Sequence, residues 1–137
     1  MPTVTGPFDV TRTSEPPYDT AAGITLGRTH FDKRFHGPLT ATSAVEMTSA
    51  MVAAVGSGAY VAIERITGTL DGRRGSFVVH HLGLMDRGRP SLTIGVVPDS
   101  GTDELVGLTG AMAIDIAPGG AHSYRFDYAL ADAPPAP

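Results

Sequence analysis

The stretch GAYVAIERITGTLDGRRGSFVVHHLG, residues 58–83, holds two runs of alternating apolar and polar residues joined by the turn sequence Asp71-Gly72. Alternation with a period of two is typical of a β-strand with one buried face, and Asp-Gly favours a tight turn. The stretch therefore predicts two antiparallel strands. The apolar face of each strand carries one polar residue, Glu64 in the first and His81 in the second, so the pattern also predicts a polar pair inside the fold.

The loop between the two strands decides how close Glu64 and His81 lie. A four-residue loop over 71–74 places them directly opposite each other, with Cβ atoms about 4.5–5.5 Å apart. A two-residue turn instead places Glu64 opposite Val79 and leaves His81 as a diagonal neighbour, and a three-residue loop breaks the alignment. The sequence leaves these registers open.

Glycine and proline divide the rest of the chain into short segments. The 17 glycines and 11 prolines leave about eight candidate strands, separated by turn residues in the manner of an antiparallel sandwich or small barrel. No helix longer than about two turns is expected. We expect strands to cover most of 21–35, 39–54, 60–70, 75–86, 91–97, 104–116 and 122–130.

The segment LTATSAVEMTSAMVAAV, 39–55, carries conflicting signals. Its alanines and methionines favour a helix, whereas its threonines, valines and alternation favour a strand. We expect a strand, with Leu39 and Val45 on one face and Glu46 on the other.

Composition excludes several classes of function. Lys and Arg number 10 against 14 Asp and Glu, and the net charge of -4 disfavours binding to nucleic acid or to an anionic membrane. Cysteine is absent, and the five histidines lack the spacing of a zinc site, so no metal is expected. The sequence has no nucleotide-binding, serine-hydrolase or zinc-protease motif. It also lacks a signal-peptide pattern and any run of roughly 18 apolar residues, so we expect a soluble cytoplasmic protein.

The predicted buried pair has two interpretations. A carboxylate and an imidazole can be a purely structural contact inside a barrel, because an unpaired buried charge is costly. The same pair beside a cavity can move protons, because burial perturbs pKa values. Inward aromatic residues are usually core residues but can line a ligand pocket. The candidate catalytic residues are Glu64, His81 and Glu46, and the candidate substrate-binding residues are Tyr60, Phe77, Leu92, Tyr124 and Phe126.

Four apolar residues, Val61, Ile63, Val78 and Leu82, fall on the faces that the pattern assigns to the outside. Apolar side chains on an outer face favour association with another subunit. We therefore expect a homo-oligomer, either a dimer or a trimer.

Several runs resemble a bacterial family of small domains of unknown function that is grouped with the allene oxide cyclase-like barrels. The resemblance covers about residues 20–130, and its most specific parts are YVAIERITGTLDGRRGSF and DELVGLTGAMAI. It implies an eight-stranded antiparallel closed β-barrel of calycin-like form, with a central cavity and with DSGTDELVGLTG, 99–110, covering one end. His80-His81 stands where the family usually has Gln-His, which keeps the inward His81 in place.

The turn residues and the extent of the resemblance together predict a division of the chain into three parts. They are an N-terminal extension or first edge segment over 1–20, a single β-barrel domain over 21–130 and a disordered Pro/Ala tail over 131–137.

The resemblance implies a fold but no agreed activity, so function has to be argued from the site. One hypothesis is an isomerase or cyclase that needs no cofactor. It would promote ring closure or cycloaddition of an apolar, conjugated natural-product intermediate confined in the cavity. The alternative is a barrel that binds a hydrophobic small molecule without catalysis.

Overall fold

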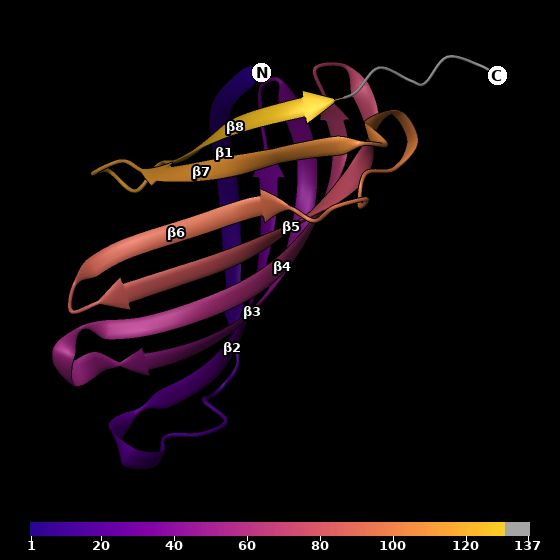
Figure 1. Ribbon diagram of the computed structural model, residues 1–137. Coiled ribbons are helices and arrows are strands. Elements are labelled where there is room, and N and C mark those ends of the chain that lie inside the picture. The colour runs from indigo at the N-terminus through magenta and orange to yellow at the C-terminus, as the bar shows by residue number, and fades with distance from the viewer. Residues whose placement is uncertain (131–137) are drawn as a thin grey trace.

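The computed structural model describes residues 1–130, which form eight β-strands and three single-turn 3-10 helices (Figure 1). The prediction of an all-β chain without a long helix is confirmed. None of the helices in residues 1–130 has the length and apolar character needed to span a lipid bilayer. The predicted tail, 131–137, lies outside the described residues. The elements are β1 Thr3–Ser14, η1 Ala21–Gly23, β2 Thr25–Phe35, β3 Leu39–Val52, η2 Ala53–Val55, β4 Ser57–Leu70, β5 Arg73–Asp86, β6 Arg89–Val96, η3 Asp103–Leu105, β7 Leu108–Ile116 and β8 His122–Leu130.

The strands form a closed antiparallel barrel. Each strand pairs with the next along the chain, and β8 pairs with β1 to complete the circle. The predicted eight-stranded closed barrel is therefore confirmed. The segment 39–55 is β3 followed by the turn η2, so the expected strand is confirmed. Alternate residues of β3 are buried in the barrel, and this burial outweighs the helix preference of alanine and methionine.

The N-terminal segment 1–20 contains a full strand of the barrel, which corrects the expected boundary at residue 20. β1 pairs with β2 on one side and with β8 on the other, and its Val4 and Phe8 are buried. Gly6 and Pro7 interrupt the apolar alternation, and both residue types are depleted in strands. For this reason the sequence pattern did not predict a strand here. Two further boundaries differ from expectation, because η1 and η3 replace the first residues of the strands expected over 21–35 and 104–116.

A two-residue turn joins β4 to β5. Leu70 pairs with Arg73, and both Asp71 and Gly72 have positive φ angles, 49° and 81°, as a type I′ turn requires. Among the registers left open by the sequence, the structure therefore has Glu64 opposite Val79, with His81 as its diagonal neighbour.

One end of the barrel is filled by side chains. The loop between β6 and β7 inserts Leu105 of η3, which is 1% exposed. This loop is fastened to β5, because the backbone N–H of Ser76 donates to Thr102 Oγ1 at 2.9 Å and that of Val78 donates to Ser100 Oγ at 3.0 Å. The segment 99–110 thus covers one end, as the resemblance implied.

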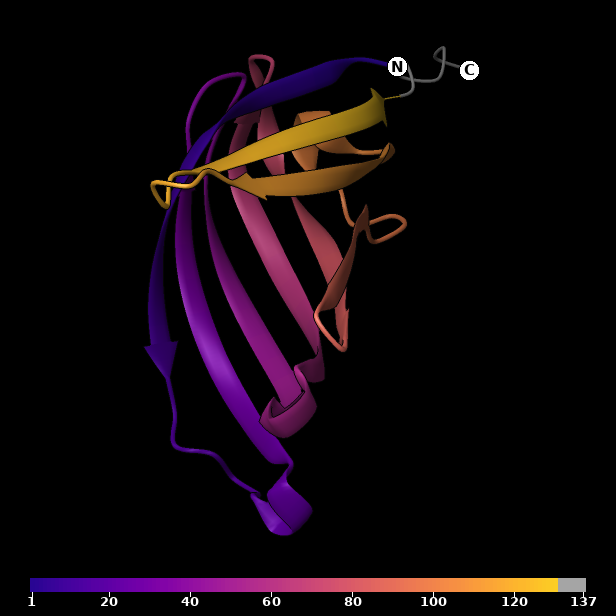
Figure 2. The same cartoon turned by 90° about the vertical axis from the view of Figure 1, so that its left-hand side faces the viewer.

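The other end of the barrel is open. β3, β4 and β5 each have 14 residues, whereas β6 has 8 and β7 and β8 have 9 each. Figure 2 shows the long strands running well past β7 and β8. β6 and β7 pair only through Ile94 with Met112 and Gly95 with Ala111. Beyond these two pairs, toward the open end, the two strands separate and leave a gap in the hydrogen-bonded wall. The inner face of the long strands is therefore reachable from outside.

Candidate functional site

Four consecutive strands each contribute one polar side chain to a hydrogen-bonded group in the barrel interior. Glu64 of β4 is fully buried and lies at the centre of the group. Its Oε1 is 2.8 Å from His81 Nε2 of β5 and 3.3 Å from Lys33 Nζ of β2, and Ser43 of β3 donates its hydroxyl to Oε2 at 2.6 Å. We call these four residues the interior polar cluster.

The strand register explains why the four side chains meet. Lys33 pairs directly with Ser43 across β2 and β3. Ser43 pairs with Ile66 of β4, and Glu64 is the next inward residue of that strand. Glu64 in turn pairs with Val79 of β5, and His81 is the next inward residue there. Inward positions recur every second residue, so the four side chains follow a diagonal row around the wall.

The environment keeps Glu64 ionised. Burial raises the pKa of a carboxyl group, but the hydrogen bond from His81, the charge of Lys33 and the hydrogen bond from Ser43 outweigh burial and hold the pKa of Glu64 below its ordinary value. Lys33 Nζ also lies 5.1 Å from the centre of the Phe8 ring, a cation–π distance. The cluster is thus built around a buried Lys33–Glu64 ion pair.

Glu64 fixes the orientation of the His81 ring. A carboxylate accepts hydrogen bonds only, so Nε2 of a neutral His81 carries the hydrogen and Nδ1 carries the lone pair. Every fully buried side-chain nitrogen and oxygen in residues 1–130 has a hydrogen-bond partner. Nδ1 of His81 has none there, so it is not fully buried. His81 is one of the residues that line a cavity in the interior. This arrangement leaves the Nδ1 lone pair unpaired on a residue of the cavity wall.

The cavity has a volume of about 270 Å³ and lies between the filled end and the open end. Phe31, Val45 and Ile114 are among its apolar lining residues. It adjoins a wider hollow of about 460 Å³ toward the open end, since Met47, Tyr60 and Leu92 line both spaces. The inner space is close to the lower limit of about 300 Å³ for small-molecule pockets.

Two of the predicted substrate-binding residues border the cavity. Tyr60 and Leu92 lie at the junction of the two hollows. The Tyr60 ring is 6.3 Å from the His81 ring, and burial together with the charge of Glu64 raises the pKa of its hydroxyl.

The other three predicted substrate-binding residues, Phe77, Tyr124 and Phe126, do not border the cavity, which corrects that expectation. Phe77 and Phe126 stack on each other in the core with ring centres 5.6 Å apart. The Tyr124 hydroxyl donates to the carbonyl of His36 at 2.7 Å and accepts from the backbone N–H of Leu39 at 3.2 Å. They face inward as predicted, but they stand too near the filled end.

Glu46 lies on the outer surface and not among the interior residues. Its carboxylate is 2.7 Å from His30 Nδ1, and Asp32 is 3.0 Å from Nε2 of the same ring. Hydrogen bonds to Glu46 and Asp32 raise the pKa of His30. Glu46 is therefore removed from the candidate catalytic residues and becomes a useful control position.

Lys33 and Ser43 were missed as site residues by the sequence reasoning. A signal existed for Lys33, because the alternation of Phe31, Lys33 and Phe35 already placed it on an apolar face. A charged residue in such a run is usually solvated, and only the position of Glu64 two strands away shows that this lysine has a buried partner.

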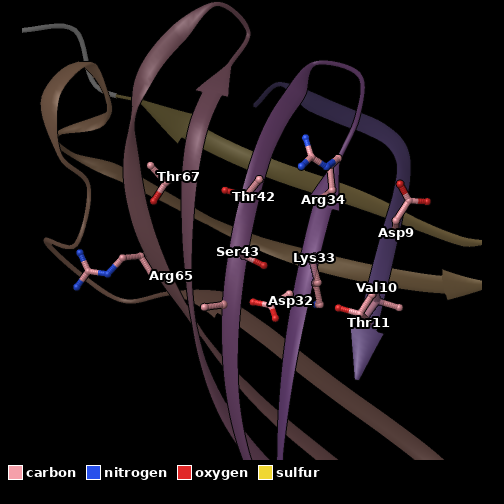
Figure 3. A pocket seen from close by; sticks show the side chains of 11 residues that line it. Asp9, Val10, Thr11, Asp32, Lys33, Arg34, Thr42, Ser43, Arg65 and Thr67 are labelled. Carbon is pink, nitrogen blue, oxygen red and sulfur yellow. The ribbon is translucent and has the colours of Figure 1, made fainter. Parts of the chain in front are cut away.

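A larger hollow of about 600 Å³ lies on the outer surface of β1–β4, behind the interior polar cluster. Figure 3 shows that Arg65 stands well apart from Asp9 and Arg34, which lie on neighbouring strands, and the three side chains do not converge on one point. The hollow therefore lacks the focused set of groups that a chemical site needs.

Comparison with known proteins supports the fold and assigns no reaction. A family model described as "Protein of unknown function (DUF3224)" matches residues 4–128. The chain is also similar to a crystal structure of a protein of unknown function from that family in Shewanella oneidensis MR-1. The two are 49% identical, the match covers 96% of this chain and 99% of that chain, and the TM-score is 0.89. None of the curated proteins compared with the chain matches it.

Proposed function

Since the chain belongs to the DUF3224 family, whose description names no activity, we propose from the site itself that the protein is a cofactor-independent isomerase or cyclase for a small, apolar, conjugated molecule. The single observation that carries the proposal is the His81 ring, which Glu64 holds through Nε2 at the wall of a mainly apolar cavity, and we infer that its Nδ1 is the atom that meets the ligand. A base held by a carboxylate in a cavity of low polarity is suited to proton transfer.

The proposed reaction is a proton shift. His81 Nδ1 takes a proton from a carbon next to a carbonyl group, and the electron pair of the broken C–H bond moves into the conjugated system. The imidazolium, stabilised by the carboxylate of Glu64, then returns the proton to a different carbon. Ring closure follows the same course if the carbanion attacks a conjugated acceptor within the same molecule before it is protonated. Neither route consumes or releases any other reactant.

The cavity favours this chemistry over the folding of a long natural-product chain. Its inner part, about 270 Å³, suits a molecule with one or two rings, and a longer substrate would extend into the hollow at the open end. A cycloaddition needs confinement but no base, so it leaves the orientation of His81 without a role.

Binding without catalysis is the second candidate function. Every fully buried polar side-chain atom in residues 1–130 has a partner, so the interior polar cluster is also a satisfied structural unit. In that case the cavity would serve an apolar ligand and Glu64 would only balance Lys33.

Deuterium exchange tests the two candidates. The probe is 1-tetralone, a two-ring ketone with a C–H group next to its carbonyl, incubated with the protein in heavy water. We expect deuterium to appear at that carbon faster with the wild type than with His81→Gln, whose amide can still donate to Glu64 but is not a base. Glu46→Gln, on the outer surface, is the matched control and should match the wild type.

Nitrogen NMR of the histidine side chains makes each outcome decisive. A shift of the His81 signals on adding 1-tetralone, together with exchange that His81→Gln loses, supports the isomerase. A shift without exchange overturns catalysis and leaves the binding barrel. If neither 1-tetralone nor 2-methylnaphthalene moves the His81 signals, the cavity is not a ligand site and both candidates fail.

A further inference from the structure

The ammonium group of Lys33 also lies at the cavity wall, and its donors are not fully used. An ammonium group has three N–H donors. Within residues 1–130 the one acceptor that Lys33 Nζ reaches is Glu64 Oε1, at 3.3 Å, which is longer than the roughly 2.7–2.9 Å of a strong charge-assisted bond. The Lys33 side chain is only 7% exposed, so bulk water has little access to the remaining donors.

We propose that Lys33 holds the oxygen of the ligand, and that the ligand is a neutral carbonyl compound whose oxygen becomes negative while His81 holds the transferred proton. The inference rests on the proposed function and adds to it the class of substrate and a residue for its recognition. Lys33 lines the same cavity as His81. Lys33 Nζ and His81 Nε2 contact the same carboxylate oxygen, Glu64 Oε1, so the two side chains lie beside each other and one small molecule in the cavity can touch both residues.

The charges of the interior polar cluster select a neutral ligand over a carboxylate. Lys33 and Glu64 cancel each other, so a bound carboxylate leaves the interior neutral only if His81 also takes up a proton from water. A ketone or enone adds no charge. After proton transfer, the positive charges of His81 and Lys33 face the negative charges of Glu64 and the enolate oxygen, and the interior stays neutral overall.

The position of Lys33 is fixed before a ligand enters. Its ammonium lies 5.1 Å from the centre of the Phe8 ring and 5.9 Å from that of Phe35, and Glu64 restrains it from the other side. A donor that is already in place stabilises a developing oxyanion without the cost of reorganising.

Binding of three two-ring probes tests the inference. The oxygen of 2-naphthol, once its proton has passed to His81, stands in for an enolate oxygen, whereas 2-methylnaphthalene has the same shape without an oxygen and 2-naphthoate carries a carboxylate. We expect the wild type to bind 2-naphthol roughly 10- to 100-fold more tightly than 2-methylnaphthalene, because of one charge-assisted hydrogen bond. The absorption spectrum of bound 2-naphthol should be that of the naphtholate.

Variants connect the preference to Lys33. Lys33→Met should abolish the preference for 2-naphthol and the naphtholate spectrum but keep the binding of 2-methylnaphthalene. The double variant Lys33→Met/Glu64→Gln, which has no unpaired charge in the interior, should behave in the same way if the single variant does not fold. Glu46→Gln should retain the wild-type preference.

Failure of this inference differs from failure of the proposed function. If 2-methylnaphthalene binds and shifts the His81 signals while 2-naphthol binds no better, Lys33 has no role in recognition and the isomerase proposal is untouched. Tighter binding of 2-naphthoate than of 2-naphthol overturns the choice of a neutral ligand. Failure of all three probes to bind overturns the cavity as a ligand site and the proposed function with it.

Discussion

Each partner of the buried Lys33–Glu64 ion pair depends on the other. Glu64 is fully buried, and the Lys33 side chain is 7% exposed. An isolated charge in such surroundings is costly, whereas an apolar pair of similar volume can be as stable as the ion pair it replaces. The stability of these variants therefore reveals how strongly the two charges are coupled.

We expect Glu64→Leu to lower the free energy of unfolding by about 3–5 kcal/mol, because it leaves the ammonium of Lys33 without a counter-charge. The double variant Lys33→Met/Glu64→Leu should be more stable than Glu64→Leu. Urea unfolding at neutral pH measures both values. Glu46→Leu removes an exposed carboxylate and should cost less than about 1 kcal/mol. A double variant no more stable than Glu64→Leu would contradict the coupling.

The lowered pKa of Glu64 makes stability depend on pH in a defined direction. Because the unfolded state binds the proton more readily than the folded state, Glu64 stabilises the fold above the ordinary glutamate pKa of 4.5, and this contribution is lost as pH falls through the lower folded pKa. We expect the stability difference between the wild type and Glu64→Gln to be constant near neutral pH and to shrink below 4.5. Thermal unfolding over a pH series measures it, and a difference that grows on acidification would refute the assignment.

At the scale of elements, the hairpin of β4 and β5 contains a glycine, Gly83, whose lack of a side chain makes room for the ring of Tyr60. Gly83 pairs with Tyr60, and a Cβ atom built on Gly83 would stand 2.1 Å from Cε1 of the Tyr60 ring. Such a distance is far inside van der Waals contact, so the ring can lie over β5 only because residue 83 is glycine. The position of Tyr60 at the junction of the two hollows depends on this neighbour.

We expect Gly83→Ala to displace the Tyr60 ring and to weaken the binding of 2-methylnaphthalene several-fold, at a stability cost of about 1–3 kcal/mol. Gly27→Ala is the matched control, since a Cβ atom there would meet its nearest neighbour, Ser49 Oγ, at 3.6 Å. The control should be neutral or slightly stabilising, because alanine restricts the unfolded chain. Probe titration and thermal unfolding report the two effects, and equal behaviour of the two alanine variants would contradict this role of Gly83.

At the scale of the whole molecule, the outer face of β4 and β5 carries an apolar patch made of Val61, Ile63 and Leu82. Their exposed fractions are 53%, 55% and 44%, and Val61 pairs directly with Leu82. Their outward direction follows from the inward direction of Glu64 and His81, because alternate residues of a strand face opposite sides. Association through this patch remains a prediction.

We expect the wild type to form a dimer or trimer at tens of micromolar, because association removes these apolar side chains from water. Ile63→Lys should shift the protein toward the monomer without unfolding it, since residue 63 is outside the core. Light scattering measures the mass, and circular dichroism confirms that the variant is folded. A monomeric wild type would show that the patch does not mediate self-association.

For β2, β4, β5 and β8, the sequence by itself determined which side faces inward, because that depends only on the local two-residue period. Glu64 and His81 were placed inside on that basis, and Lys33 was placed on the same face as Phe31 and Phe35. A turn at Asp71-Gly72 was also predicted from the residue types, but the number of loop residues was left open and only the structure shows two.

Only the tertiary structure decided how far along the barrel each inward residue stands. The period gives the face but not the height, which depends on strand register and on the closure of β1 against β8. Because of the strand register, Phe77 and Phe126 lie in the packed core near the filled end, whereas Tyr60 lies at the cavity. It also brought Lys33 and Ser43 to Glu64 across sequence separations of 31 and 21 residues, contacts that no local pattern encodes because they arise only when neighbouring strands pair.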